Sequence, residues 1–272
     1  MKGPDADALV DLLAGRPTEI ELDRAALQIA RIEYPDLDAA AAIAELDRHA
    51  FAIAERAQDL SNGQNFVETA SRYLFVEAGF RGNQEDYYNP DNSCLNRVLE
   101  TKRGIPITLS VIYIEVARRL AKNVKGVGLP GHFIVRYDDI DYAAWMDPFH
   151  GGRVLTLEDC CRLAQVEEIE IKALLAVSTR HVVMRMLNNL RGIYFTRRNA
   201  EKALDVLDLL LAAAPDSADE HKQRGVALLE QQRTREAMSA FQRYLELSPD
   251  APDREGIEEQ IRNISIWLAS QN

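Results

Sequence analysis

The residues of this chain that could do chemistry lie between positions 104 and 147. A helix is predicted to begin at Pro106, and His132 and Asp147 stand on two predicted neighbouring strands. A nucleophile at a helix start, a histidine base and an orienting carboxylate together make a triad for acyl transfer or amide hydrolysis. The helix begins with Pro106-Ile107-Thr108-Leu109-Ser110 and offers no cysteine where the helix N-terminus would favour a thiolate. The sequence predicts a base and an acid and leaves the nucleophile open.

Three side chains are candidates for the missing nucleophile. Cys94 is the nearest cysteine in the sequence, but a free cysteine on a short apolar helix is more often a buried packing residue. Thr108 and Ser110 carry hydroxyls in the first turns of the helix, where such groups usually hydrogen-bond the helix backbone. Cys94 is then either a vestigial member of the catalytic set with His132 and Asp147, or, like Thr108, a relocated nucleophile.

Polar side chains around the predicted triad are candidates for binding. Asn92 and Asn96 flank Cys94, and Thr108 and Ser110 open the helix. We predict that these four side chains help to recognise an extended peptide or amide. His132 and Asp147 have alternative interpretations as a structural histidine and as a turn before Pro148.

The sequence predicts no metal site and no cofactor. His150 stands in a turn with Gly151-Gly152, and a single histidine without further ligands does not make a metal site. The adjacent pair Cys160-Cys161 lacks the spacing of zinc ligands and is most simply explained by packing.

Helices and a small sheet must position these residues. Apolar periodicity predicts helices over 22–30, 41–57 and 65–78, a loop over 79–91, and a buried helix over 106–120 with proline at its first position. Segments 124–129, 133–137 and 142–146 are rich in β-branched and aromatic residues and are separated by turn residues. They predict a small antiparallel sheet that carries His132 and Asp147.

The last third of the chain contains an internal repeat. Ala203 recurs as Ala237 and Pro215 as Pro249, each 34 positions later, which is the period of the tetratricopeptide repeat. The residues after Pro249 repeat with helical spacing and predict a capping helix over the open end of the stack. We therefore predict two domains, residues 1–168 and residues 169–272.

Composition and charge limit the classes of partner that this protein can have. The net charge is −11, and residues 171–272 hold 14 basic and 14 acidic side chains, so the acidic excess lies in residues 1–170. An acidic first domain repels phosphate, which argues against nucleic-acid binding. There is no uncharged apolar run of the roughly eighteen residues that a membrane span needs, and the N-terminus is too acidic for a secretory signal. We expect a cytoplasmic protein with a protein or peptide partner and with neither a nucleic-acid nor a membrane partner.

Three motifs resemble a known family. CLNRVLETKRGIPITLSVIYIEVARRL, GVGLPGHFIVRY and MDPFHGGRVLTLEDC occur in this order between residues 94 and 160. The chain resembles the SirB-type transglutaminase-like proteins, which are bacterial chains with a degenerate transglutaminase core and C-terminal tetratricopeptide repeats. This resemblance implies that His132 and Asp147 occupy the positions of the family's base and orienting acid, while the family's catalytic cysteine would fall near Pro106 or Ile107.

The expected fold is therefore α+β. A helical lead-in and a papain- or transglutaminase-like core with a small antiparallel sheet are followed by an all-α repeat domain. The expected function is a protein- or peptide-binding regulatory module on a catalytically degenerate core. The alternative is a thiol or hydroxyl hydrolase, or an acyl transferase, that acts on peptide amides through Cys94 or Thr108.

Overall fold

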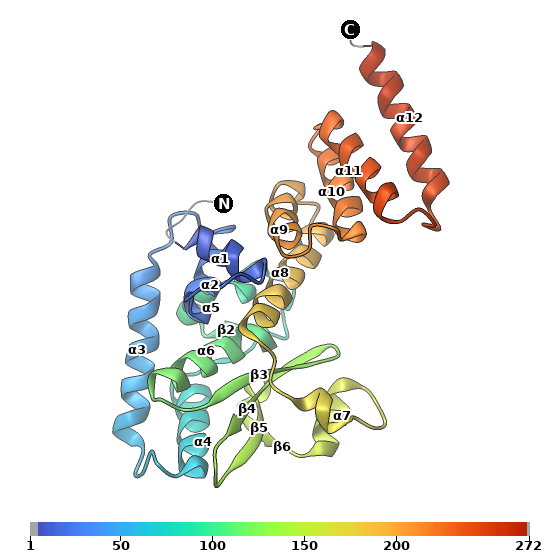
Figure 1. Cartoon of the computed structure of the whole chain (residues 1–272). Helices are drawn as coiled ribbons and strands as arrows, with labels where there is room; N and C mark the ends of the chain where they lie inside the picture. Colours follow the sequence, from blue (N-terminus) through green and yellow to red (C-terminus); the bar gives the residue numbers. More distant parts are fainter. Residues whose placement is uncertain (1–4, 271–272) are drawn as a thin grey trace. The chain divides into compact units, whose positions relative to one another are not determined.

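The computed structural model describes residues 5–270 and confirms the α+β fold class (Figure 1). Two compact units are present: Glu19–Met186 makes up the first, and Ala6–Thr18 with the chain from Leu187 onward makes up the second. The predicted domain limits, 1–168 and 169–272, stay a prediction, and residues 169–186 lie in the first unit. No helix among the described residues is long and apolar enough to cross a membrane.

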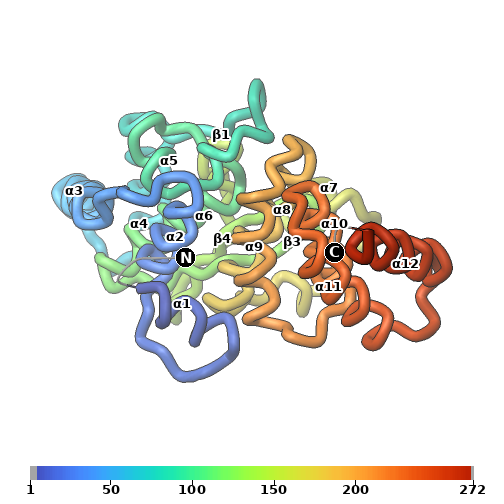
Figure 2. Tube along the Cα trace, turned by 90° about the horizontal axis from the view of Figure 1, so that it is seen from above, coloured from blue at the N-terminus to red at the C-terminus, as the bar shows by residue number. Residues whose placement is uncertain are grey.

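Helices form the larger part of the first unit. They are α2 (Leu22–Ala30), α3 (Ala39–Arg56), α4 (Gly63–Arg72), α5 (Leu95–Thr101), α6 (Pro106–Arg119) and α7 (Leu157–Ala164), with the short turns η1 (Tyr73–Glu77), η2 (Pro90–Ser93), η3 (Pro148–His150) and η4 (Ile171–Leu174). Pro106 opens α6, where its missing N–H costs no hydrogen bond. α2, α3 and α5 pack against α6, and α3 lies at the edge of this helical group (Figures 1 and 2).

The sheet of the first unit has four antiparallel strands in chain order. They are β3 (Val124–Leu129), β4 (His132–Asp138), β5 (Ala143–Asp147) and β6 (Arg153–Leu155). α6 packs against β3 and β4. Val127 and Ile134 pack with Cys160 of α7 and Leu174 of η4 in a buried apolar cluster. β4 and β5 are paired, with Val135 opposite Met146, so the start of β4 and the end of β5 meet.

The loop predicted over residues 79–91 contains one element that the sequence did not indicate. β1 (Arg81–Gly82) pairs in parallel with β2 (Arg103–Gly104), directly before α6. This two-residue ladder ties the loop to the entrance of α6. It is too short to leave a periodic signal in the sequence.

The second unit is all helical. It contains α1 (Ala6–Leu13), the end of α8 (Thr179–Thr196), α9 (Ala200–Ala213), α10 (Ala218–Glu230), α11 (Thr234–Leu247) and α12 (Arg254–Ser270). Leu207, Leu228 and Phe241 are fully buried in its core. α12 packs on α11 and buries Ile257 and Ile264 in the same core, in the segment for which the sequence predicts a capping helix.

Candidate functional site

His132 and Asp147 meet where β4 begins and β5 ends. The Nε2 atom of His132 lies 3.0 Å from Oδ1 of Asp147. Both residues are buried, with Asp147 wholly inaccessible and His132 8% exposed. Arg185 of α8 fixes the turn before β4, because its Nη2 atom donates to the backbone oxygens of Leu129 and His132 at 2.8 and 2.6 Å. The two residues predicted as base and acid are therefore in hydrogen-bond contact.

Asp147 is held as a carboxylate. Its Oδ1 atom accepts hydrogen bonds from the backbone N–H groups of Phe149 and His150 at 3.1 and 3.3 Å. Burial raises the pKa of Asp147, but hydrogen bonding and charge from His132, and less from His150, outweigh burial and leave the pKa below its usual value. A carboxylate only accepts hydrogen bonds, so Nε2 of His132 is the donor in this pair.

His150 is the site residue that the sequence analysis missed. Its Nδ1 atom lies 2.7 Å from Oδ2 of Asp147, and its ring stacks on that of His132 at a centroid distance of 5.7 Å. The sequence predicts His150 only as an isolated turn residue, because it does not reveal that Asp147 caps η3 and accepts a hydrogen bond from the His150 ring. The signal available was the spacing Asp-Pro-Phe-His, which places the fourth residue beside the first in a tight turn. His132, Asp147 and His150 are called the His–Asp–His cluster below.

Aromatic side chains frame the His–Asp–His cluster. Phe149 stands edge-on to His132 at 6.0 Å between ring centroids, and Tyr87 lies 6.1 Å from Phe149. Gly82 allows this approach, because a Cβ atom there would lie 2.6 Å from the Phe149 ring. The short ladder of β1 and β2 therefore sets the position of Phe149 beside the cluster.

The candidate nucleophiles are placed unfavourably for chemistry. Cys94 is fully buried at the cap of α5, and Ser110 Oγ donates to the backbone oxygen of Pro106 at 2.8 Å. Thr108 is fully buried and its hydroxyl has no hydrogen-bond partner. The pKa of the Cys160 thiol is raised to about 11, first by burial and then by the charges of Cys161, Asp159 and Asp147. Cys160 is therefore a poor source of thiolate.

Asn92 and Asn96 make contacts in different places in the first unit. Asn92 Nδ2 donates to the backbone oxygens of Asp86 and Tyr87 at 2.6 and 3.2 Å, and its Oδ1 accepts from Asn83 at 3.0 Å. Asn92 thus holds the loop that carries Tyr87. Asn96 instead lines a pocket of about 700 Å³ to which neither His132 nor Asp147 contributes.

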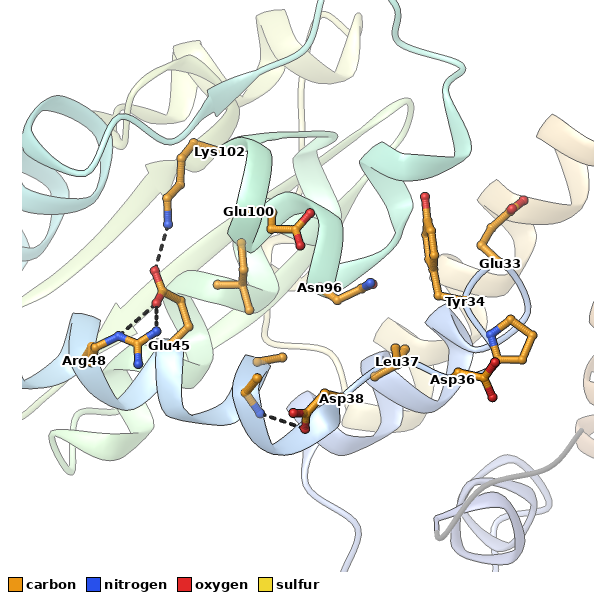
Figure 3. A pocket seen from close by; sticks show the side chains of 14 residues that line it. Glu33, Tyr34, Asp36, Leu37, Asp38, Glu45, Arg48, Asn96, Glu100 and Lys102 are labelled. Atoms are coloured by element: carbon orange, nitrogen blue, oxygen red, sulfur yellow. Dashed lines mark hydrogen bonds and ion pairs between the residues drawn. The ribbon is translucent and has the colours of Figure 1, made fainter.

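This pocket, called the acidic pocket below, lies between α3 and α5 (Figure 3). Its lining comprises Glu33, Tyr34, Pro35, Asp36, Leu37, Asp38, Ala41, Ala42, Glu45, Arg48, Asn96, Leu99, Glu100 and Lys102. Glu45 is joined to Arg48 and Lys102, and Asn96 lies between Glu100 and Tyr34 (Figure 3). The side-chain oxygen of Asn96 is buried without a hydrogen-bond partner. Five carboxylates against two cations make the pocket acidic.

Comparisons with known proteins agree with this architecture. A family model described as the transglutaminase-like superfamily matches residues 40–188, and a tetratricopeptide-repeat model matches residues 190–262. A UPF0162 protein of Xylella fastidiosa is 36% identical over 232 residues, which cover 82% of this chain and 83% of that protein. A UPF0162 protein of Pseudomonas aeruginosa is 28% identical over 222 residues, which cover 80% of each chain. F-box only protein 21 of Mus musculus is 33% identical over 167 residues, which cover 56% of this chain and 26% of that protein. No solved structure matches the chain.

Proposed function

The chain belongs to the transglutaminase-like superfamily, as a SirB-type member with tetratricopeptide repeats, and we propose that it is a protein- or peptide-binding module without a covalent step. The observation that carries this proposal is an oriented His132–Asp147 pair with no thiolate to activate. Cys94 and Cys160 are fully buried, and the raised pKa of Cys160 keeps it protonated at neutral pH. Without a nucleophile, His132 and Asp147 orient and recognise a bound peptide but form no acyl intermediate with it.

The acidic pocket supports the binding role. Its volume of about 700 Å³ lies within the range of ligand sites, and its apolar floor is made by Leu37, Ala42 and Leu99. The unsatisfied oxygen of Asn96 offers an acceptor for an N–H group of a bound chain. Because tetratricopeptide repeats generally mediate protein–protein interaction, the second unit supplies a further surface of the same kind.

The charge of the pocket selects the partner. The lining has five carboxylates and two cations, Arg48 and Lys102, and both cations are engaged by Glu45, so the pocket keeps a net negative charge. We expect a segment rich in lysine and arginine to bind here. A cytoplasmic location is proposed with this function, and three free cysteines are compatible with a reducing compartment.

A polarisation titration with a labelled peptide of lysine, arginine and serine tests the binding role. The double variant Glu33→Gln with Asp36→Asn should weaken binding roughly fivefold, because each surface charge contributes up to about 1 kcal/mol. The matched control, Glu230→Gln with Asp250→Asn, removes two carboxylates in the second unit and should leave binding unchanged. An equal loss of affinity in both double variants would mean that binding depends only on the net charge of the chain, and would count against the acidic pocket as the binding site.

One observation favours the alternative of a hydroxyl-dependent hydrolase or acyl transferase. Thr108 Oγ1 is buried at the first turn of α6 and makes no hydrogen bond, so its hydroxyl is not committed to another group. Release of amine from a peptide amide that persists in Cys94→Ala and disappears in Thr108→Val would establish this function. If the wild-type chain releases no amine from the peptide amide, the alternative of a hydroxyl-dependent enzyme is wrong.

A further inference from the structure

We propose that His132, Asp147 and His150 bind one divalent transition-metal ion of the Zn²⁺ type. Each residue offers one ligand atom, and the three atoms lie within 4.8 Å of one another. This site goes beyond the proposed peptide binding and does not depend on it.

The spacing of the three ligand atoms is close to what Zn²⁺ requires. Zn–N and Zn–O bonds of about 2.0–2.2 Å place tetrahedral ligands roughly 3.3 Å apart. Nε2 of His132 lies 3.0 Å from Oδ1 of Asp147, and Nδ1 of His150 lies 2.7 Å from Oδ2, so both imidazoles already face the same carboxylate. The three ligand atoms are at most 4.8 Å apart, and the His150 side chain, which is 39% exposed, has room to move towards a bound ion.

The donor set determines the type of ion. Two imidazoles and one carboxylate suit Zn²⁺, Co²⁺ and Ni²⁺, whereas Mg²⁺ and Ca²⁺ prefer sets of oxygen ligands. Three protein ligands leave a fourth position for water or for a group of a bound peptide, in contrast to the closed shell of structural zinc sites.

The surroundings of the cluster already hold the ligands in place. The backbone N–H groups of Phe149 and His150 fix the Asp147 carboxylate, and Arg185 fixes the backbone of His132. Such supporting hydrogen bonds orient ligands at metal sites. The ion would take the place of the hydrogen bonds that now join the two imidazoles to Asp147.

Calorimetric titration of ZnCl₂ into the full metal-free chain tests the proposal. We expect one equivalent of Zn²⁺ to bind, and His150→Gln to weaken binding roughly tenfold or more. The variant changes an exposed side chain, so its fold is checked by its melting temperature without metal. His221→Gln, which removes a partly exposed histidine from the second unit, should bind like the wild-type chain.

A second measurement uses the wild-type chain, so its result does not depend on how well a variant folds. Diethyl pyrocarbonate modifies accessible histidines, and Zn²⁺ should protect His150 but not His221, as read by peptide mass. No binding of Zn²⁺ by the wild-type chain, equal binding by His150→Gln, or unprotected His150 would overturn the proposal. Because no peptide takes part, these outcomes are independent of whether the acidic pocket binds a basic segment.

Discussion

Asp147 is the residue on which the candidate site depends most. It is inaccessible to solvent and accepts hydrogen bonds from His132, from His150 and from two backbone N–H groups. A single carboxylate therefore fixes the orientation of the base, the position of His150 and the fold of η3. Whatever the site binds, its geometry follows from this one side chain.

Replacing Asp147 should destabilise the first unit in a graded way. Asp147→Ala leaves several donors unsatisfied and should lower the free energy of unfolding by about 2–4 kcal/mol. Asp147→Asn retains one acceptor oxygen, so it should lower the free energy of unfolding by less than Asp147→Ala. Urea unfolding measures both variants. Asp159→Ala is the comparison. Asp159 is a partly buried residue of the capping box of α7, and its replacement should cost only about 1 kcal/mol. An equal loss for Asp147→Ala would contradict the role given to Asp147.

His49 makes stability depend on pH. Nε2 of His49 lies 3.2 Å from Lys102 Nζ and 3.3 Å from Glu45 Oε1, and Nδ1 lies 3.0 Å from the Tyr73 hydroxyl oxygen. Burial, and then the charge of Lys102, outweigh the charge of Glu45 and lower the pKa of His49 to about 4. The unfolded histidine has a pKa near 6.5, so the unfolded chain binds this proton first as the pH falls.

Acidification from pH 6.5 to pH 4 should therefore destabilise the fold, by up to about 3 kcal/mol from His49 alone. His49→Gln should remove this part of the pH dependence, whereas His221→Gln should keep it. Urea unfolding at pH 7 and pH 5 gives the difference. An unchanged pH dependence in His49→Gln would show that His49 is not held neutral in the folded chain.

At the scale of elements, the repeat helices pack through a specific close approach. A Cβ atom at Gly225 in α10 would lie 2.5 Å from the ring of Phe241 in α11, whereas one at Gly256 in α12 would meet nothing within 4 Å. Gly225→Ala should thus separate α10 from α11 and cost about 1–3 kcal/mol. Gly256→Ala should stabilise α12 by about 0.5–1 kcal/mol, because alanine is the better helix former. Thermal unfolding compares the two variants, and equal melting temperatures would contradict this packing.

Elements with strong periodicity were predictable, and contacts between distant elements were not. The predicted strand over 124–129 matches β3, and the helix predicted from Pro106 matches α6, because apolar spacing and proline mark both in the sequence. The pairing of His132 with Asp147 followed from neighbouring strands. His150 was missed because a three-residue turn has no period, and Asn96 was grouped with His132 because the sequence does not reveal which side of α5 faces the acidic pocket.

At the scale of the whole molecule, the negative charge of −11 favours basic partners. The excess lies in residues 1–170, which include every residue that lines the acidic pocket. Binding of a basic peptide should therefore weaken as salt is raised from about 0.05 to 0.3 M, since ions screen exposed charges beyond a Debye length of about 10 Å. The polarisation titration at several salt concentrations measures this effect, and an affinity that is independent of salt would contradict electrostatic selection.

Binding without a covalent step leaves the masses of both partners unchanged, so we would measure those masses after binding. The chain is saturated with the labelled basic peptide, binding is verified by polarisation, and the mixture is then denatured and analysed by mass spectrometry. We predict that protein and peptide both keep their original masses after reversible binding. A cleaved peptide or a peptide adduct on the protein that is lost in His132→Ala would contradict non-covalent binding and identify the chain as an enzyme.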